Sequence, residues 1–457
     1  MLKQPSNGLS NGAGGSHDHA NHVPRAWRKE ASVYQVYPSS FKDSNGDGIG
    51  DIPGITSKVG YIQQLGVDIV WLCPIFKSPQ ADMGYDISDY CHVHEPHGTI
   101  ENVEELIQGL HSPGMKCLLD LVVNHTSDQV EATLSGQRGA HNWFEQSRSS
   151  LSNSHRDWYI WRKPKYDSAG NRQPPNNWKA IFGGSAWEYD EQTDEYYLHL
   201  FLKEQPDLKW DHPPVRDAVC EVMRFWLDRG CDGFRIDAIN FISKPPGLPD
   251  DRSENRWNML GLEHYANGPR LHEYLKVIGG VLREYDAFSV GDMGHLTDLD
   301  EVLRSVGADR GELAMVFHFE IMDMDHGSDF TTGTPWMRVN EDYAKWNAES
   351  QVNAPDSVFQ YYPTVLQLRK EYKDIFVYGE FKLLAPDHQQ LFVHKRMSGS
   401  KSAVVVMNFK ETGITFEAAD LIGGKLGKVL LSNYAGLSVE EPSITLGPFG
   451  AFVALLS

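Results

Sequence analysis

The sequence predicts an α/β protein in which helices pack against a parallel β-sheet. Apolar runs of strand length alternate with amphipathic stretches of helical spacing three times before residue 125, and the alternation resumes after residue 205. This rhythm is typical of parallel sheets, whose strands are buried on both faces. The run Gly233–Asp237 (GFRID) follows one such amphipathic stretch and ends in a carboxylate. Because (β/α)8 barrels place catalytic side chains at the carboxyl ends of buried strands, we predict a barrel of TIM type.

Six predicted strands are apolar runs bounded by turn residues or by glycines that end helices. In chain order they cover residues 31–37, 67–76, 115–123, 233–237, 288–291 and 315–319. The helices between them carry apolar residues three or four positions apart, which gives each helix one buried face. These faces run from Ile55 to Leu65, from Val103 to Leu110, from Val215 to Trp226 and from Leu271 to Leu282. Strand and helix therefore follow each other as repeated β–α units.

Two regions depart from this alternation. Residues 126–205 are rich in tryptophan, tyrosine, asparagine and charge, and we interpret them as a small domain inserted after the third strand. After a helix over residues 357–372, short strands at 391–395, 403–408, 429–431 and 444–455 predict an antiparallel β-sandwich. The predicted domains are a disordered tail (1–26), the first barrel part (27–125), the insertion (126–205), the second barrel part (206–372) and the β-sandwich (373–457).

Composition narrows the class of function. The chain has 457 residues, 40% of them hydrophobic, and a formal net charge of −20. That charge disfavours nucleic acid or an anionic membrane as a partner. No apolar run is long enough for a signal peptide or a membrane span, and the five cysteines lack metal-ligand spacing, so we interpret them as reduced core residues. We therefore expect a cytoplasmic protein that binds neither nucleic acid nor membrane.

The stretch from Asp43 to Asp51 matches the first nine positions of a calcium-binding loop. Oxygen-bearing side chains stand at alternate positions, and the glycines between them permit a tight wrap around a cation. The twelfth position is Gly54, so the bidentate glutamate of an EF-hand is missing. The alternative is a loop of Asx turns that binds no metal. Both interpretations are open from the sequence.

Several motifs in order resemble the α-amylase-type glycoside hydrolases, in the branch of fungal and yeast maltases and oligo-1,6-glucosidases. They are the calcium-type loop, residues 82–86 (DMGYD), 120–127 (DLVVNHTS), 205–210 (QPDLKW) and 233–237 (GFRID). The resemblance covers residues 27–327 and resumes from residue 330 to the end. An isolated Arg-x-Asp pattern such as Arg235 and Asp237 is more often a structural ion pair. Five motifs in the family's order are a more specific signal.

The resemblance implies a retaining glycosidase and a role for each site residue. Such enzymes use two carboxyl groups about 5–5.5 Å apart, one as nucleophile and one as acid/base. Asp237 would be the nucleophile, held ionised by Arg235, and Asp292 stands at the acid/base position. The implied substrate contacts are hydrogen bonds from Asp82 and His125, stacking by Tyr85, a pocket wall at Phe182 and, at Ala238, a small side chain that favours α-1,4 linkages. The implied ligands of a structural Ca²⁺ or Mg²⁺ are Asp43, Asn45, Asp47, the carbonyl of Ile49, and Asp51.

Two departures from the family pattern bear on activity. The family has glutamate where this chain has Asp292, and the shorter aspartate reaches about 1 Å less far, a shift that costs on the order of a hundredfold in rate. After Gly327 the pattern jumps to Phe330, which leaves out strands seven and eight and the third catalytic carboxylate. At about 30 residues per strand–helix unit, at least about 60 residues of barrel are missing. We therefore predict an incomplete barrel with an internal deletion near residues 327–330.

Three functional hypotheses are open. The first is a maltase-like α-glucosidase that releases terminal glucose from maltose, sucrose and similar short oligosaccharides. The second is a homologue without catalytic activity, which the two departures favour. The third is an oligo-1,6-glucosidase acting on isomaltose, or a relative that transfers the glucosyl group to another sugar from the same site. The products formed from maltose, isomaltose and sucrose would separate these hypotheses.

Overall fold

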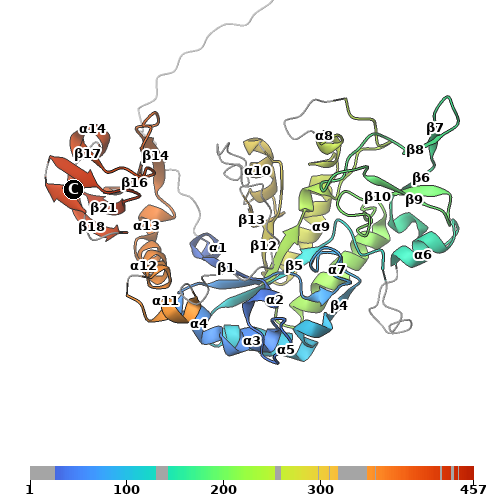
Figure 1. The fold of residues 1–457 in the computed structure, drawn as a ribbon, viewed down its shortest axis with the longest axis horizontal. Coiled ribbons are helices and arrows are strands. Elements are labelled where there is room, and N and C mark those ends of the chain that lie inside the picture. The colour runs from blue at the N-terminus through green and yellow to red at the C-terminus, as the bar shows by residue number, and fades with distance from the viewer. Residues whose placement is uncertain are drawn as a thin grey trace, which may run out of the picture. The chain divides into compact units, whose positions relative to one another are not determined.

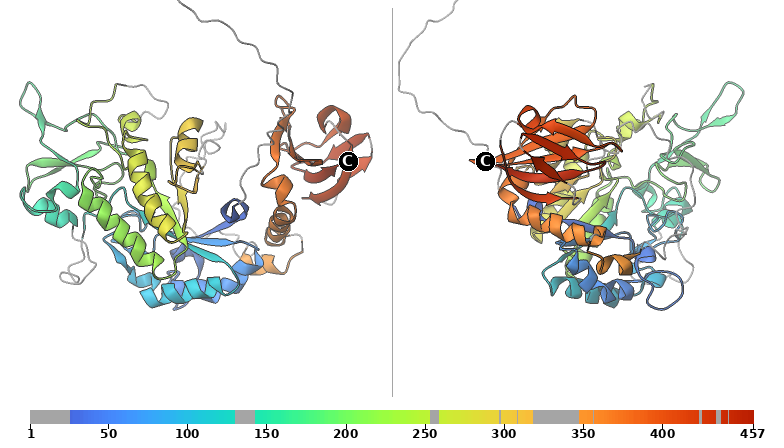
Figure 2. Two further views of the ribbon diagram at one scale, coloured as in Figure 1. Left: turned by 180° about the vertical axis from the view of Figure 1, so that it is seen from behind. Right: turned by 60° about the vertical axis from the view of Figure 1, so that its left-hand side comes forward.

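The computed structural model describes residues 26–129, 143–252, 259–296, 298–307, 309–317, 347–355, 357–422, 425–433, 437–440 and 442–457. These residues form two compact units, one within 31–367 and one that joins residues 26–30 to 368–457. The larger unit holds a parallel sheet with its helices, and the smaller unit holds antiparallel sheets (Figures 1 and 2). The junction predicted at residues 327–330 and nearly all of the predicted tail lie outside the described residues.

Six parallel strands form the main sheet of the larger unit, and all six predicted strands are confirmed. In their order across the sheet they are β1 (Val33–Val36), β2 (Ile69–Leu72), β5 (Lys116–Val122), β11 (Gly233–Asp237), β12 (Phe288–Gly291) and β13 (Met315–Val316). Every neighbouring pair is parallel. Among the described strands β1 and β13 lie at the two edges of the sheet, so each has one neighbour.

The second predicted strand is shorter than expected. Within the run 67–76 only β2 belongs to the main sheet, and Cys73 and Pro74 follow it in irregular structure. Proline has no N–H to donate to a sheet ladder, which explains why the strand stops there. Beyond it, β3 (Phe76–Lys77) pairs antiparallel with β4 (Asp89–Val93) outside the main sheet.

The first predicted helix, from Ile55 to Leu65, is two helices instead of one. They are α3 (Ile52–Ser57) and α4 (Val59–Gln64), and Lys58 separates them with φ −111° and ψ 10°. The Ser57 hydroxyl donates to the carbonyl of Gly54 at 2.6 Å, a local bond that competes with helix continuation. The other helices of the larger unit are α2 (Pro38–Phe41), α5 (Ile100–His111), α7 (Pro213–Leu227), α8 (Leu262–Tyr265), α9 (Leu271–Glu284), α10 (Leu299–Val306) and α11 (Ala348–Val352).

The two faces of the sheet carry different side chains. Val70, Leu119 and Ile236 point to the helices and belong to the main hydrophobic core. Strand residues alternate between faces, so Arg235 and Asp237 lie on the opposite face. Trp71 also lies on that face, and the Arg235 guanidinium is 5.2 Å from the centre of its ring. The sheet therefore has one apolar face covered by helices and an opposite face on which Arg235 and Asp237 lie beside a smaller hydrophobic cluster that includes Trp71, Leu118 and Val290.

Residues 143–205 contain short elements that differ from the β–α units. They are α6 (Trp143–Ser149), β6 (Trp161–Arg162), β7 (Lys165–Tyr166), β8 (Arg172–Gln173), β9 (Trp187–Asp190) and β10 (Glu195–Leu198). Strands β6, β10 and β9 form an antiparallel sheet. Leu198 and Trp187 share a hydrophobic cluster with Ala238 and Phe241, which directly follow β11. This stretch therefore packs against the carboxyl end of the strand that carries Asp237.

The smaller unit is built from two antiparallel sheets. Their strands are β14 (Glu380–Leu384), β15 (Leu391–Ser398), β16 (Lys401–Asn408), β21 (Ala451–Leu456) and β18 (Leu426–Ser432) in one sheet, and β17 (Ile414–Glu417), β20 (Ser443–Leu446) and β19 (Ser438–Glu440) in the other. Val404 of the first sheet and Ile444 of the second share one core. The run 444–455, predicted as one strand, is two strands separated by the turn at residues 447–450.

Helices accompany these sheets. The predicted helix at 357–372 is confirmed as α12 (Val358–Glu371), whose residues up to 367 belong to the larger unit. The helices α1 (Trp27–Glu30), α13 (Lys373–Phe376) and α14 (Ala418–Ile422) belong to the smaller unit. The hydroxyl of Tyr378 accepts from the N–H of Ala26 at 3.1 Å and donates to Glu30 at 2.8 Å. These contacts join residues 26–30 to the C-terminal part of the chain within one unit.

The cysteines agree with the prediction of reduced core residues. All five are free, and Cys73, Cys117, Cys220 and Cys231 are buried, whereas Cys91 is half-buried. Burial raises the pKa of the Cys73 thiol to about 11, which keeps it protonated. Within the described part of the chain, every helix is too short or too polar to cross a lipid bilayer.

Candidate active site

Four charged side chains meet at the carboxyl ends of three adjacent strands. Asp120 lies in β5, Arg235 and Asp237 lie in β11, and Asp292 directly follows β12. The parallel register sets Arg235 beside Asp120. The N–H of Asp292 donates to the carbonyl of Ile236 at 2.8 Å, which continues the ladder past the end of β12. Strand pairing therefore positions all four residues.

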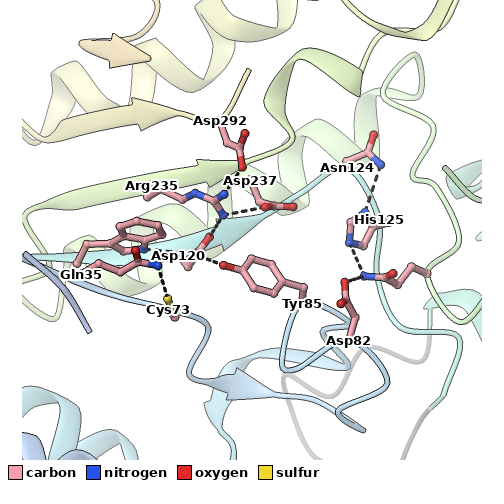
Figure 3. A network of polar contacts seen from close by, with 12 residues as sticks. Gln35, Cys73, Asp82, Tyr85, Asp120, Asn124, His125, Arg235, Asp237 and Asp292 are labelled. Atoms are coloured by element: carbon pink, nitrogen blue, oxygen red, sulfur yellow. Dashed lines mark hydrogen bonds and ion pairs between the residues drawn. The ribbon is translucent and has the colours of Figure 1, made fainter. Parts of the chain in front are cut away.

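Arg235 is the centre of this cluster (Figure 3). Its Nη1 donates to Asp120 Oδ1 at 2.8 Å and to Asp237 Oδ1 at 2.7 Å, and its Nη2 donates to Asp292 Oδ2. The arginine side chain is only 7% exposed, so these contacts are screened little by solvent. The planar guanidinium holds several carboxylates in fixed directions, which a lysine would not do. The structure thus brings Arg235, Asp237 and Asp292 together.

The single positive charge of Arg235 cannot neutralise the negative charges of three carboxyl groups around it. Burial raises the pKa of Asp292 to about 7; the attraction of Arg235 opposes this rise, and the charges of Asp237 and Asp120 add to it. Burial likewise raises the pKa of Asp120 to about 6. Burial works against the charge of Arg235, but the three carboxylates outweigh it and hold its pKa above the usual value. Asp292 therefore exchanges a proton near neutral pH, as a general acid/base requires.

Asp120 is fixed by two aromatic donors. Trp71 Nε1 and the Tyr85 hydroxyl both donate to Asp120 Oδ2, at 3.2 and 3.1 Å. The centre of the Tyr85 ring lies 5.7 Å from the Arg235 guanidinium, within cation–π range. Burial raises the pKa of Tyr85, which stays a protonated donor. Asp120 itself is fully buried, so it positions Arg235 and does not reach solvent.

A second group of polar side chains contains Asp82 and His125 (Figure 3). Gln205 Nε2 donates to Asp82 Oδ2 at 2.9 Å and lies 3.0 Å from His125 Nε2. The other ring nitrogen of His125 lies 3.2 Å from Asn124 Nδ2. Burial raises the pKa of Asp82, and the bond from Gln205 opposes the rise. Gln205 therefore fixes the two predicted substrate-binding side chains relative to each other.

Asp237 and Asp292 line one cavity of about 220 Å³. The other lining residues are Ile181, Phe201, Ala238, Phe241, Gly294 and His295. Ala238 has φ 42°, a left-handed conformation that costs free energy for a residue with a Cβ. Phe182, predicted as a pocket wall, is 59% exposed and packs edge-on against Phe201 with ring centres 5.9 Å apart. Phe201 and Ile181 form the wall at this point.

Sequence reasoning missed several residues of the site. Gln205 begins the QPDLKW motif, yet its role depends on contacts across 80 or more residues of chain. Lys244 is buried and pairs with Asp207 at 2.5 Å, also donating to Asn124 at 3.0 Å. His295 follows Asp292 by three positions, and this proximity was the one signal in the sequence that pointed to it.

The calcium-type loop is arranged by its own hydrogen bonds. Asp43 accepts from the N–H groups of Asn45, Gly46 and Gly48 at 2.6–3.0 Å, and the Gly46 and Gly48 bonds lower its pKa. Asp47 accepts from Ile49 at 2.8 Å. Asp51 is buried and caps α3 through the N–H of Gly54. Within the residues that the structure describes, no three acidic, histidine or cysteine side chains gather as a metal site. The donor set is all oxygen, which suits Ca²⁺ or Mg²⁺.

This geometry defines a class of protein: a buried Arg–carboxylate centre at the strand ends of an α/β barrel sheet, with two carboxyl groups on one cavity, is suited to glycosidic bond cleavage. The sequence matches the family described as alpha amylase, catalytic domain, over residues 35–329 and 322–379. The chain therefore belongs to the α-amylase family, and its catalytic unit is a glycoside hydrolase domain of the kind that acts on α-glucosides.

Two relatives span nearly the whole chain. The α-glucosidase of Schizosaccharomyces pombe is 36% identical over 94% of this chain and 98% of its own length. The oligo-1,6-glucosidase of Bacillus cereus is 35% identical over 94% of this chain and 99% of its own length.

Two solved structures are similar in fold as well. The trehalose-6-phosphate hydrolase of Bacillus licheniformis has a TM-score of 0.84 at 30% identity, covering 95% of this chain and 100% of that one. The isomaltulose synthase of Erwinia rhapontici, solved with sucrose, also has a TM-score of 0.84, at 28% identity and the same coverage. Hydrolysing and isomerising enzymes are thus both among the similar structures.

Proposed function

We propose that this chain is a maltase-like α-glucosidase that removes terminal α-linked glucose from short substrates such as maltose and sucrose. The observation that carries the proposal is the contact of Arg235 with both Asp237 and Asp292, which line the same cavity. The names of the relatives, α-glucosidase and oligo-1,6-glucosidase, support this substrate class. We propose neither nucleic acid nor a membrane as a binding partner.

The reaction proceeds in two steps with retention at the anomeric carbon. Asp237 attacks that carbon as the glycosidic bond breaks, and a glucosyl-enzyme ester forms. Asp292 supplies the proton that the departing oxygen needs, and later accepts one from the water that hydrolyses the ester. Arg235 holds the Asp237 carboxyl in place, because its Nη1 donates to Asp237 Oδ1 at 2.7 Å. The raised pKa of Asp292 supports its part in both steps, because a group that titrates near pH 7 can donate and accept.

The remaining site residues bind and select the sugar. Asp82 and His125 would hydrogen-bond the glucosyl hydroxyls, and Gln205 would hold both in place. Tyr85 and Phe182 would provide aromatic surface for the ring. Ala238 leaves more room beside the nucleophile than valine, which supports α-1,4 over α-1,6 preference.

We also propose that the barrel lacks strands seven and eight and that residues 126–205 are an inserted domain. The alignment with the S. pombe enzyme spans 583 positions, which exceeds the 457 residues of this chain by 126. The two segments of the family match meet at residues 322–329, beside the predicted junction. Both observations support a missing stretch near the predicted junction, which is where the resemblance places the third catalytic carboxylate.

Glucose release from maltose tests the proposed function. We expect the purified chain to release glucose from maltose faster than from isomaltose, and Asp237→Asn to release none, because an amide cannot form the glucosyl ester. The measurement is glucose by a coupled assay, with equal folded protein verified by circular dichroism. Equal release by the chain and its Asp237→Asn variant would refute the proposal and favour a non-catalytic homologue.

A glucosyl-transferring activity is the second candidate. Its support is the similarity to isomaltulose synthase, which was solved with sucrose as its natural substrate. If a sugar hydroxyl attacks the glucosyl-enzyme ester faster than water does, sucrose is converted into its isomers in place of free glucose and fructose. Chromatography of the products from sucrose distinguishes the two activities.

We propose further that the protein resides in the reducing cytoplasm, as its five free thiols suggest.

We also propose that a structural Ca²⁺ or Mg²⁺ ion binds to the loop of Asp43, Asn45, Asp47, Ile49 and Asp51. Calcium is expected to raise the unfolding temperature of the chain, and EGTA to lower it. Asp47→Asn should abolish the calcium effect because it removes a charged ligand. Differential scanning fluorimetry measures this, and a calcium effect equal in both proteins would argue against the site.

A further inference from the structure

We propose that His295 is a further catalytic residue. In place of Asp292, it gives the proton to the leaving-group oxygen and takes one from the attacking water, which revises the proton transfers assigned to Asp292 under the proposed function. This inference rests on the proposed glycosidase function. His295 lines the same cavity as Asp237 and Asp292, and histidine is the side chain whose ordinary pKa lies nearest to neutral pH. The family glutamate, for which Asp292 stands, would perform this proton transfer alone.

The backbone holds His295 at the cavity in a costly conformation. Its φ is 60°, in the left-handed region that residues with a Cβ avoid. Ala238, on the other strand end that borders the cavity, is also left-handed. Such residues persist where surrounding structure fixes them, and they gather at active sites. Here Asn240 Nδ2 donates to the carbonyl of Gly294 at 2.9 Å, which anchors the peptide just before His295.

The imidazole ring is oriented as well as placed. It lies parallel to the ring of Phe241, with an interplanar angle of 9° and centres 6.5 Å apart. Phe241 lines the cavity too and packs edge-on against Tyr265, with ring centres 5.3 Å apart. The ring plane of His295 is therefore set by an aromatic neighbour that is itself fixed. A proton donor needs this kind of fixed direction more than it needs a particular pKa.

Asp292 alone is poorly disposed for the transfer. One of its oxygens accepts from Arg235 Nη2, so the carboxyl is turned toward the strand end. Its side chain is one methylene shorter than that of glutamate, and a misplacement of about 1 Å costs on the order of a hundredfold in rate. His295 is a longer side chain in the same cavity. It can supply the reach that Asp292 lacks, while Asp292 stays paired to Arg235.

The proposed steps balance in protons and bonds. In the first step a ring N–H of the His295 imidazolium gives its proton to the glycosidic oxygen as the bond from that oxygen to the anomeric carbon breaks. The bond from Asp237 to the same carbon forms, and His295 is left neutral. In the second step neutral His295 takes a proton from water, whose oxygen attacks the carbon. The ester bond breaks, and Asp237 and the imidazolium are regenerated.

Two substrates that differ in their need for a proton test this role. The leaving group of maltose is the oxygen of the second glucose, which must be protonated, whereas the fluoride of α-glucosyl fluoride leaves without full protonation. We expect His295→Asn to lower the rate of glucose release from maltose by about a hundredfold or more. Release from α-glucosyl fluoride in the presence of azide should be unchanged, because azide attacks without a base. Asparagine tolerates the left-handed conformation, so the variant should fold.

The control is His264→Asn. His264 also lies nearly parallel to an aromatic ring, that of Trp178, at 17° and 5.9 Å, but it does not line the cavity. It should match the unaltered chain on both substrates. Adding Asp292→Glu to His295→Asn should restore release from maltose, because the longer carboxyl makes the histidine unnecessary.

The outcomes separate this inference from the proposed function. If His295→Asn keeps the unaltered ratio of the two rates, the inference is wrong and Asp292 acts alone. If Asp292→Glu fails to restore the rate on maltose while the doubly substituted protein melts normally, the inference is also wrong. If the unaltered chain shows no Asp237-dependent release from either substrate, the proposed function fails and the inference fails with it.

Discussion

Arg235→Met is expected to destabilise the larger unit by about 3–5 kcal/mol and to abolish glucose release. The guanidinium contacts Asp120, Asp237 and Asp292 within a buried cluster. A methionine of similar length fills the space but leaves three carboxyl groups without their shared cation. Chemical denaturation followed by tryptophan fluorescence measures the loss. Arg235→Lys keeps the positive charge but lacks the two guanidinium nitrogens that hold separate carboxyl groups. Its stability should therefore lie between those of Arg235→Met and the unaltered protein.

The loss in Arg235→Met should depend on pH in a defined direction. Asp292 and Asp120 already have pKa values raised to about 7 and about 6 in the folded chain. Removing the cation raises them further, so above about pH 6 the folded variant binds more protons than the folded unaltered protein. A raised folded pKa gives stability that is present below the unfolded value, near 4, and is lost as the pH rises through the folded value. Because the unfolded state is the same in both proteins, the gap to the unaltered protein should be widest above about pH 7. It should narrow as the pH falls through about 7 and about 6 and stay level below that. A gap that widens in acid would contradict this account of the cluster.

Gly233→Ala is expected to prevent the pairing of β11 with β12. A Cβ at this position would lie 1.9 Å from the carbonyl oxygen of Phe288, which is main chain and cannot rotate away. The φ of Gly233 is also +151°, outside the ordinary range for alanine. Forcing such a contact costs on the order of 3 kcal/mol or more. Because β11 and β12 carry Asp237 and lead to Asp292, the separation of these strands should remove activity together with stability.

Gly60→Ala is the matched control for this substitution. Gly60 lies on the exposed side of α4, and a methyl group at this position would have no other atom within 4 Å. Alanine is favoured over glycine in a helix by about 1 kcal/mol, so the control should be as stable as the unaltered protein or more stable. Thermal unfolding by circular dichroism compares the two. A Gly233→Ala protein that melts at the same temperature as the control would contradict the prediction, because it would show that the methyl group is accommodated without cost.

Local sequence patterns predicted which helices and strands form. Where some of them divide or end could not be predicted from those patterns. Apolar runs placed all six strands of the parallel sheet because burial on both faces leaves an unbroken signal. The split between α3 and α4 was not visible in the spacing of Ile55 and Leu65, since the side-chain bond of Ser57 to Gly54 competes locally with the helix. The strand expected over residues 444–455 likewise hid a turn at 447–450.

Some features of the active site could also be predicted from the sequence, and others could not. Asp237 and Asp292 were predictable because each ends an apolar run, and strand ends are where barrels place their chemistry. The sharing of Arg235 by three carboxyl groups was not predictable, because Asp120 lies 115 residues and Asp292 lies 57 residues away in sequence. Which oxygen meets which nitrogen depends on register and side-chain rotamer. His295 was missed because only its distance of three positions from Asp292 pointed to it, and that spacing does not show which cavity its side chain lines.

If the barrel is incomplete, as proposed above, the two edges of the parallel sheet have a consequence for handling the protein. Among the described strands, β1 pairs only with β2 and β13 only with β12. A closed barrel has no edges, whereas an open sheet presents rows of main-chain donors and acceptors to other molecules. Such rows recruit strands from neighbouring copies, and this recruitment grows with concentration. Dilution, more than cooling, should therefore govern how long a preparation stays free of aggregates.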